Sequence, residues 1–434
     1  MLQQPAKKRT MRGGREDAAA GGSWIAPPPP AAVRCNNRST CNPAGALLVN
    51  LFSTTSRASS STTTTSTTNS STPLMLHHEW IIDGKVQAGS SSSSSSSSSS
   101  TPSEQQQDGN VIVFLHGLLG NNKNLRTPAK LLSKKTGVSA LMIDLRGHGE
   151  SASSSSSASS SSSALDQQDQ LLNPIQNCAS DVIHTLQQLN LTGTASPKYI
   201  CGHSFGGRCA LAYHHMLLTN TNTNTDTDTD TNEMAQSQLV NPPKHCWILD
   251  SCPGKAHSSV AKVIDAVSSI QMPIQSKKEL VQILTRDKNI DLAIASWMTT
   301  NLRPSTVKSN SNANVNANAN GFEFMFDLQV VHSILKDFPN QDMIGMLQEC
   351  MHTPSHVHAQ AHEHAHTIHK VIASKNDSWT PEIMQQLQVI QDNVHSSNGN
   401  ANANVNLNLI SLDAGHWVHI DALDALMEHM MKEF

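Results

Sequence analysis

The chain has 434 residues, a formal net charge of −4 and a pI near 6.6, with no long basic cluster interleaved with aromatic residues. This balance disfavours a polyanion partner, so we expect no binding to nucleic acid. The longest apolar stretch near the N-terminus, Ala44–Phe52, is too short to span a bilayer. We therefore expect a soluble protein without a membrane span.

Low-complexity tracts reduce the hydrophobic content to 37%, which is low for a globular chain. Such tracts of Ser, Thr, Asn and His cannot bury enough apolar surface to offset the entropy of ordering. Length alone allows two or three domains, but the sequence outside the tracts suffices for one globular domain of ordinary size. The eight cysteines include no CxxC pair, which indicates buried thiols in a reducing compartment.

Residues 1–73 differ in composition from the rest of the chain. They contain eight basic residues but only two acids, Glu16 and Asp17, and Ser and Thr dominate from Ser53 to Thr72. An Arg-rich, Ser-rich and acid-poor segment is typical of a transit peptide. We expect a mitochondrial protein, with the plastid or the cytoplasm as alternatives. A plain disordered tail is the competing interpretation, and Pro27–Pro30 favours it.

From residue 74 on, strand patterns alternate with helix patterns. Short apolar runs predict strands at Leu76–Ile82, Val111–Leu115, Ala140–Ile143, Lys198–Cys201, Cys246–Leu249, Ile368–Ala373 and Leu407–Leu412. Helical spacing predicts helices at Leu125–Thr136, 175–189, Gly207–Leu218, Pro381–Asp392 and Ile420–Phe434. This alternation predicts an α/β protein with a mostly parallel central sheet and helices on both faces.

Between Cys252 and Ile368 the alternation fails. Helical patterns fill this segment at Lys277–Thr285, Asp291–Leu302, Leu328–Phe338 and Met343–Cys350. We therefore expect residues 74–252 and 368–434 to form the core, and residues 253–367 to form a helical cap. The low-complexity tracts fall between predicted elements and mark loops, at 90–100, 151–163, 219–232, 309–320 and 398–408.

The strongest chemical signal is Gly202–Gly207, which reads Gly-His-Ser-Phe-Gly-Gly. It follows a predicted strand and opens a predicted helix, the context that a nucleophile elbow requires. The glycines two residues before and after Ser204 leave room for neighbouring backbone. This arrangement predicts Ser204 as a nucleophile.

A serine hydroxyl is a weak nucleophile until a neighbouring base takes its proton. His416 follows the last predicted strand and precedes the last helix, where a loop brings an imidazole over the elbow. The backbone N–H groups of Phe205 and of Leu118, in the loop His116–Gly120, are the expected oxyanion donors.

Together these motifs resemble the α/β-hydrolase superfamily, and within it the YbfF-type small esterases with their mitochondrial and plant relatives. The motifs are His116–Gly120, Asp144–Ser151, Gly202–Gly207 and Gly415–His419, and those that resemble the plant branch are Leu249–Lys255 and Trp297–Leu302. The resemblance covers about residues 75–434 apart from the repeats. It implies hydrolysis of carboxylic esters or thioesters, a small-molecule substrate and no cofactor.

The acid of the triad has two candidates. Most members of the fold place it after the seventh strand, where Lys375–Trp379 offers Asp377. The resemblance to the YbfF-type branch implies instead an acid at the end of the sixth strand, which is Asp250. Either carboxylate could orient His416 and stabilise its imidazolium. We expect Asp250, because its segment is the closer match, and keep Asp377 as the alternative.

Two other groups of polar residues receive structural interpretations. Asp144, Arg146 and His148 are expected to form a hydrogen-bonded turn that shapes one wall of the site. Alternating histidines could bind zinc or nickel adventitiously, but they lack a spaced acid–histidine motif, so we expect no functional metal. These histidines are His352, His356, His358, His362, His364, His366 and His369.

The predicted function is a serine hydrolase that cleaves esters or thioesters through an acyl-enzyme intermediate. Serine at the elbow excludes the dehalogenase and epoxide-hydrolase chemistries of this fold, which need aspartate there. Two alternatives stay open. One is a non-catalytic ligand-binding protein on the same scaffold, and the other is a carbon–carbon bond hydrolase that uses the same triad.

Overall fold

The computed structural model describes residues 73–87, 108–152, 174–220, 239–305, 321–352, 366–397 and 405–434. The segment in which we expect a transit peptide lies outside these ranges, apart from residue 73. Most of each low-complexity tract also lies outside them. Within the described ranges, no helix combines the length and the apolar character needed to cross a membrane.

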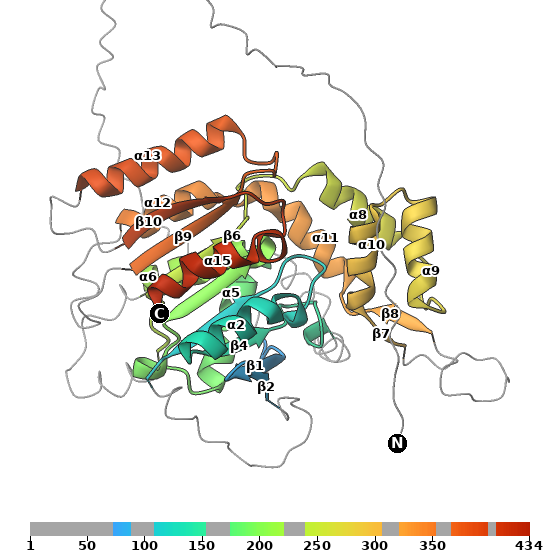
Figure 1. Cartoon of the computed structure of the whole chain (residues 1–434), viewed down its shortest axis with the longest axis horizontal. Helices are drawn as coiled ribbons and strands as arrows, with labels where there is room; N and C mark the ends of the chain where they lie inside the picture. Colours follow the sequence, from blue (N-terminus) through green and yellow to red (C-terminus); the bar gives the residue numbers. More distant parts are fainter. Residues whose placement is uncertain are drawn as a thin grey trace, which may run out of the picture. The chain divides into compact units, whose positions relative to one another are not determined.

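The centre of the described chain is an eight-stranded sheet (Figure 1). In spatial order its strands are β2 (Lys85–Val86), β1 (His78–Ile82), β4 (Ser139–Ile143), β3 (Val111–Leu115), β5 (Tyr199–His203), β6 (His245–Leu249), β9 (His366–Ala373) and β10 (Val405–Leu412). The strands from β4 to β10 pair in parallel, whereas β1 pairs antiparallel with β4 and β2. The parallel strands therefore end at one edge, where ligands bind in open α/β sheets.

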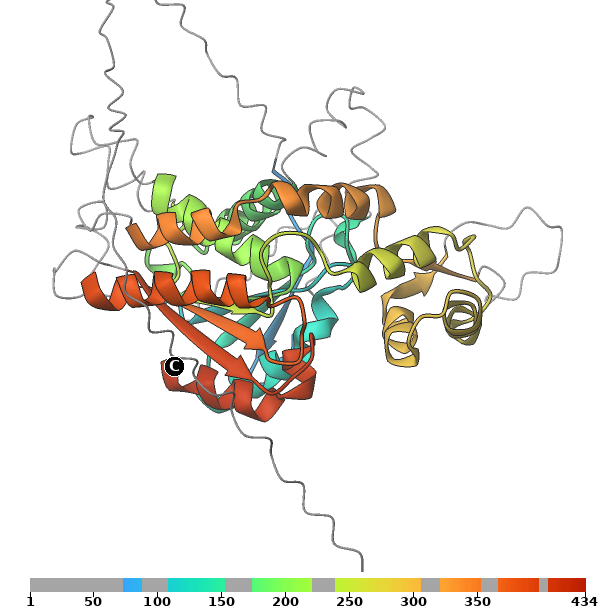
Figure 2. The same ribbon diagram turned by 90° about the horizontal axis from the view of Figure 1, so that it is seen from above.

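Helices cover both faces of the sheet (Figure 2). This explains why every side chain of β3 and β4 is buried. On one face lie α2 (Arg126–Thr136), α14 (Val418–Asp421) and α15 (Leu423–Met430). On the other lie α5 (Pro174–Gln188), α6 (Phe205–Asn220), α12 (Met343–His352) and α13 (Pro381–Ser397). The predicted mostly parallel sheet with helices on both faces is confirmed.

Local sequence sets where these elements begin and end. Helix α2 stops at Gly137, whose left-handed φ of +77° lets its N–H donate to the carbonyl of Ser133 at 3.1 Å. At the sheet edge, the tract expected as a loop at 398–408 contributes its last residues to β10. Val405 and Leu407 are buried there and alternate with Asn406 and Asn408, a period that suits a strand.

The elements of the cap lie together beside the sheet (Figure 2), and their buried side chains form a separate hydrophobic cluster. Its helical elements are α8 (Ser258–Ser268), α9 (Lys277–Gln282), the π-turn Ile283–Asp287, α10 (Leu292–Met298) and α11 (Leu328–Asp337). A two-stranded ribbon of β7 (Leu302–Pro304) and β8 (Phe322–Phe324) adds to them. This ribbon was not predicted, because each strand is only three residues long.

Helix α12 lies within the segment expected to form the cap, but it packs on α6 instead. Leu347 and Cys350 are buried in the same cluster as the sheet. The cap is therefore shorter than the range 253–367, because the apolar stripe of α12 joins the main core.

The position of α12 has a measurable consequence. Leu347→Ala should lower the free energy of unfolding of the core by about 2–5 kcal/mol, the usual cost of a leucine-sized cavity. Urea unfolding followed by circular dichroism measures this change. The exposed neighbour Gln348→Ala is the control, and equal stabilities of the two variants would contradict the packing described here.

Candidate active site

Ser204 occupies a sharp turn between β5 and α6, at the carboxyl edge of the sheet. Its φ is +54°, in the left-handed region that costs a non-glycine residue roughly 1 kcal/mol or more. Its N–H donates to the carbonyl of Leu249 in β6 at 2.9 Å. Such strain persists only where the surroundings hold the backbone, and it is typical of functional sites.

The two glycines flanking Ser204 are required by close backbone approach. A Cβ at Gly202 would lie 2.0 Å from the carbonyl oxygen of Gly206. A Cβ at Gly206 would lie 2.3 Å from the carbonyl oxygen of Leu115, the last residue of β3. The turn therefore packs directly against the end of β3, next to the loop that contains Leu118.

Asp250 and His416 are hydrogen-bonded partners in this structure. The His416 Nδ1 lies 2.7 Å from the Oδ2 of Asp250, and that carboxylate is buried with 1% of the residue exposed. When Nδ1 donates its proton to Asp250, the Nε2 of His416 is left as an acceptor. This is the tautomer that a general base for a serine hydroxyl requires.

Asp377 lies elsewhere. Its side chain is 82% exposed, and its Oδ1 lies 3.2 Å from the Nε2 of His257. The loop that carries Asp377 instead supplies two donors to Asp250, the Asn376 side-chain amide and the Trp379 indole N–H, each at 2.6 Å. The structure thus brings Asp250, and not Asp377, together with His416.

Sequence reasoning missed the residues that hold this pair in place. Asn376 and Trp379 stood in a segment considered only for its aspartate. His203 was passed over inside the elbow, yet its Nε2 donates to the carbonyl of His416 at 2.8 Å. Burial lowers the pKa of His203 well below its usual value, so this ring is a neutral donor. The only sequence signal for a role of His203 was its position directly before the predicted nucleophile, Ser204.

The expected oxyanion donors are free to bind a ligand. Among the described residues, no acceptor is hydrogen-bonded to the N–H of Phe205 or of Leu118. Phe205 is the first residue of α6, where helix N–H groups have no partner within the helix. Two histidines brace the loop that contains Leu118. His116 donates to the carbonyl of Gly117 at 2.8 Å, and His148 accepts from the N–H of Leu119 at 3.2 Å.

The motif that contains Asp144, Arg146 and His148 forms a buried scaffold beside the site. The carboxylate of Asp144 accepts the N–H of Asn122 at 2.6 Å. Arg146 makes two 2.7 Å hydrogen bonds to Asp181, and both residues are buried. Burial lowers the pKa of His148 to about 3, so its ring stays neutral. These contacts agree with the expected hydrogen-bonded turn.

A cavity of about 710 Å³ lies between the loops that carry Ser204 and His416 and the cap. Ser204, His416 and Leu118 line it from the core, while Val260, Ile294 and Trp297 line it from the cap. This volume lies within the range of small-molecule sites, and the cap residues make that side of the wall apolar. Arg208 connects α6 to the segment after β6, since it donates to the carbonyls of Cys252 at 2.6 Å and Gly254 at 2.7 Å.

The histidine-rich segment, from which we expected no metal site, is only partly described. His352 ends α12, and His366 and His369 lie in β9, while the other four histidines fall outside the described residues. One candidate set of metal ligands occurs in the described ranges, and it is outside this cavity.

Comparisons with known proteins support this fold. The family described as "Serine aminopeptidase, S33" matches residues 106–222, which contain the elbow and the loop of Leu118. The chain is similar to the sn-1-specific diacylglycerol lipase ABHD11 of Danio rerio, with 25% identity over 42% of this chain and 44% of that protein. The relative of the same name in Xenopus laevis is 33% identical over 24% of this chain and 28% of its own length.

A further relative, "Probable alcohol acetyltransferase" of Saccharomyces cerevisiae, is 33% identical over 23% of this chain and 24% of that protein. The chain thus spans less than half the length of each of these curated relatives. Among solved structures, "Marine microorganism esterase" matches 74% of this chain and 94% of its own, with 17% identity and a TM-score of 0.46. The fold is the α/β-hydrolase fold, and the family match and relatives support the α/β-hydrolase superfamily.

Substitution of the two candidate acids, Asp250 and Asp377, should affect kcat very differently. Asp250→Asn should lower kcat by orders of magnitude, because loss of the orienting carboxylate costs about 10⁴-fold in serine proteases. Asp377→Asn should lower kcat by less than about tenfold, because the exposed Asp377 pairs with His257 and not with His416, and exposed ion pairs contribute little. Steady-state ester hydrolysis measures both, with circular dichroism as the check on folding. The reverse ranking would assign the role to Asp377.

Proposed function

We propose that this protein is a serine hydrolase that cleaves carboxylic esters through Ser204, His416 and Asp250. The observation that carries the proposal is the 2.7 Å contact between His416 and buried Asp250, in a cavity that Ser204 also lines. A nucleophile on a strained turn after β5, an orienting acid after β6 and a base after β10 are the elements of this chemistry.

The geometry supports a two-step mechanism. The Ser204 Oγ attacks the ester carbonyl carbon while the Nε2 of His416 takes the hydroxyl proton, and Asp250 stabilises the resulting imidazolium. The N–H groups of Phe205 and Leu118 stabilise the tetrahedral oxyanion. His416 then protonates the departing alcohol, which leaves an acyl group on Ser204. Water, deprotonated by His416, hydrolyses this acyl-enzyme and restores the serine.

The cavity supports an apolar acyl substrate. Val260, Ile294 and Trp297 offer an acyl chain burial, at roughly 0.8 kcal/mol for each CH₂ removed from water. The lipase and acetyltransferase names of the relatives also concern acyl esters. Thioesters present the same carbonyl carbon to Ser204 and belong to the proposed substrate class. Kinship with the YbfF-type esterases is part of this proposal.

Replacing the nucleophile tests the proposal. Ser204→Ala should lower hydrolysis of p-nitrophenyl esters by at least about 10⁴-fold and abolish labelling by a fluorophosphonate probe, which requires an activated serine. The thermal midpoint should not fall, because a strained turn loses only a hydroxyl. Ser396→Ala, on the exposed end of α13, is the matched control. Labelling that persists without Ser204 would overturn the assignment, and an unlabelled wild type would favour a non-catalytic binder.

We also propose that residues 1–73 direct the protein to mitochondria, on the strength of their basic, acid-poor composition. Deleting them should move the protein to the cytosol and leave ester hydrolysis and the thermal midpoint unchanged. Fluorescence microscopy and fractionation measure the first effect, and calorimetry measures the second. Organelle localisation that survives the deletion would contradict the proposal, as would a large loss of thermal stability.

A further inference from the structure

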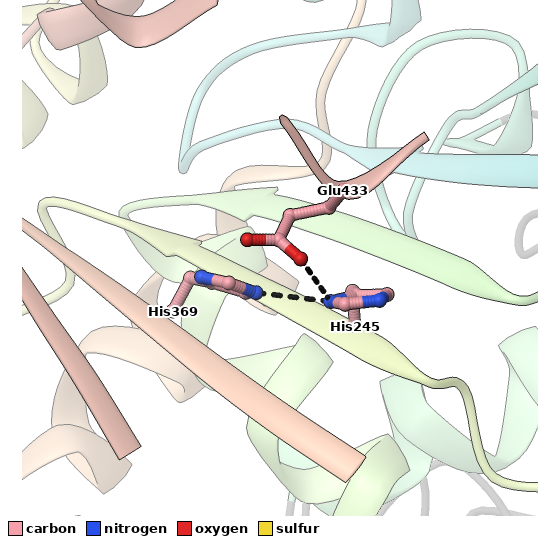
Figure 3. A group of neighbouring side chains, drawn as sticks. All are labelled: His245, His369 and Glu433. Atoms are coloured by element: carbon pink, nitrogen blue, oxygen red, sulfur yellow. Dashed lines mark hydrogen bonds and ion pairs between the residues drawn. The ribbon is translucent and has the colours of Figure 1, made fainter. Parts of the chain in front are cut away.

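Two histidines and a glutamate meet at the end of the sheet remote from Ser204 (Figure 3). His245 is the first residue of β6, His369 lies in the adjacent strand β9, and Glu433 lies in the 3₁₀ turn Met431–Glu433 that follows α15. We propose that His245, His369 and Glu433 form a binding site for a divalent transition-metal ion of the zinc type.

The spacing of the ligand atoms suits such an ion. The Nδ1 of His245 lies 3.1 Å from the Nε2 of His369 and 3.6 Å from the Oε2 of Glu433. Two ligands about 2.05 Å from a tetrahedral zinc ion are separated by about 3.3 Å, so both contacts bracket the ideal value. All three ligand atoms lie within 4.8 Å of one another. A small rotation of the partly exposed Glu433 side chain would bring its carboxylate oxygen closer to the two histidine nitrogens. Water would complete the coordination of the ion.

The surroundings hold His369 in an orientation that a ligand needs. The Trp247 ring stacks on it at 4.0 Å with an interplanar angle of 5°. Its second nitrogen, Nδ1, contacts the side-chain amide of Asn408 at 3.3 Å. The Nδ2 of Asn408 faces this nitrogen, and turning the amide over would place its Oδ1 there to accept the Nδ1 proton and leave Nε2 for the metal. Metal-binding histidines usually have such a second partner.

The charges also favour a cation. Only one of the two facing imidazole nitrogens can carry the proton of a His245–His369 hydrogen bond, and a metal ion replaces that proton. Glu433 supplies a carboxylate at the solvent side, where an ion can enter.

This site is separate from the proposed catalytic groups. His245 begins β6, whereas Asp250 follows its other end, roughly 16 Å away at 3.3 Å per residue. A bound ion would instead join the segment after α15 to β6 and β9. That segment is already held by the Tyr199 hydroxyl, which donates to the carbonyl of Glu433 at 3.2 Å, and by stacking of Tyr199 on Phe434. The metal therefore acts as an added clamp on the fold.

Zinc titration of the full chain tests the proposal, after EDTA treatment and dialysis. Isothermal calorimetry should count one Zn²⁺ ion fewer in Glu433→Gln and in His245→Gln than in the wild type. Where a variant still binds this ion, its affinity should be at least roughly tenfold lower than that of the wild type. Zn²⁺ should also raise the thermal midpoint of the wild type more than that of either variant. Glu428→Gln and His332→Gln are matched controls, since they remove the same groups at exposed positions outside both the cluster and the histidine-rich segment.

The controls separate this site from the histidine-rich segment, because every protein compared retains His356, His358, His362 and His364. If Glu433→Gln and the wild type bind the same number of Zn²⁺ ions with the same affinities, the proposal is wrong. Glu433 is partly exposed, so Glu433→Gln should fold normally. This variant therefore tests the metal site even if His245→Gln fails to fold. Cobalt substitution gives a second readout, and identical visible spectra for wild type and Glu433→Gln would also overturn the site.

Discussion

The buried carboxylate of Asp250 is the constraint on which the arrangement of the site depends. An unpaired charge in the interior costs several kcal/mol, so every lone pair needs a donor. Asp250 obtains four, from the N–H of Ala373, the side chains of Asn376 and Trp379, and the ring of His416. These donors come from the last residue of β9 and from the loops after β9 and β10, and the two loops must therefore converge on the end of β6.

The parallel register of the sheet explains why the proposed nucleophile and acid are neighbours. His203 pairs with Leu249, so the two residues that follow them, Ser204 and Asp250, leave adjacent strands at the same level. Both adopt left-handed backbone, with φ of +54° and +43°. Two strained residues side by side are stable because each is bonded to the next strand, Ser204 to Leu249 and Asp250 to Val371.

The sequence predicted what depends on local pattern. Apolar runs identified the buried strands, and glycine spacing with a strand before and a helix after identified the turn at Ser204. Contacts between distant segments were not accessible in this way. Neither the donors from Asn376 and Trp379 to Asp250 nor the meeting of His245 with Glu433 has a signature in spacing. Helix α12 was misplaced for the same reason, since an apolar stripe does not say which core it joins.

The proposed mechanism requires that Ser204, His416 and the N–H groups of Phe205 and Leu118 surround a single reacting carbonyl. A crystal structure of the protein inactivated by a phosphonate ester tests it most directly. We expect a covalent bond from the Ser204 Oγ to phosphorus, with the phosphoryl oxygen about 2.7–3.1 Å from both N–H nitrogens. An adduct on another residue, or a phosphoryl oxygen bonded to neither N–H group, would contradict it.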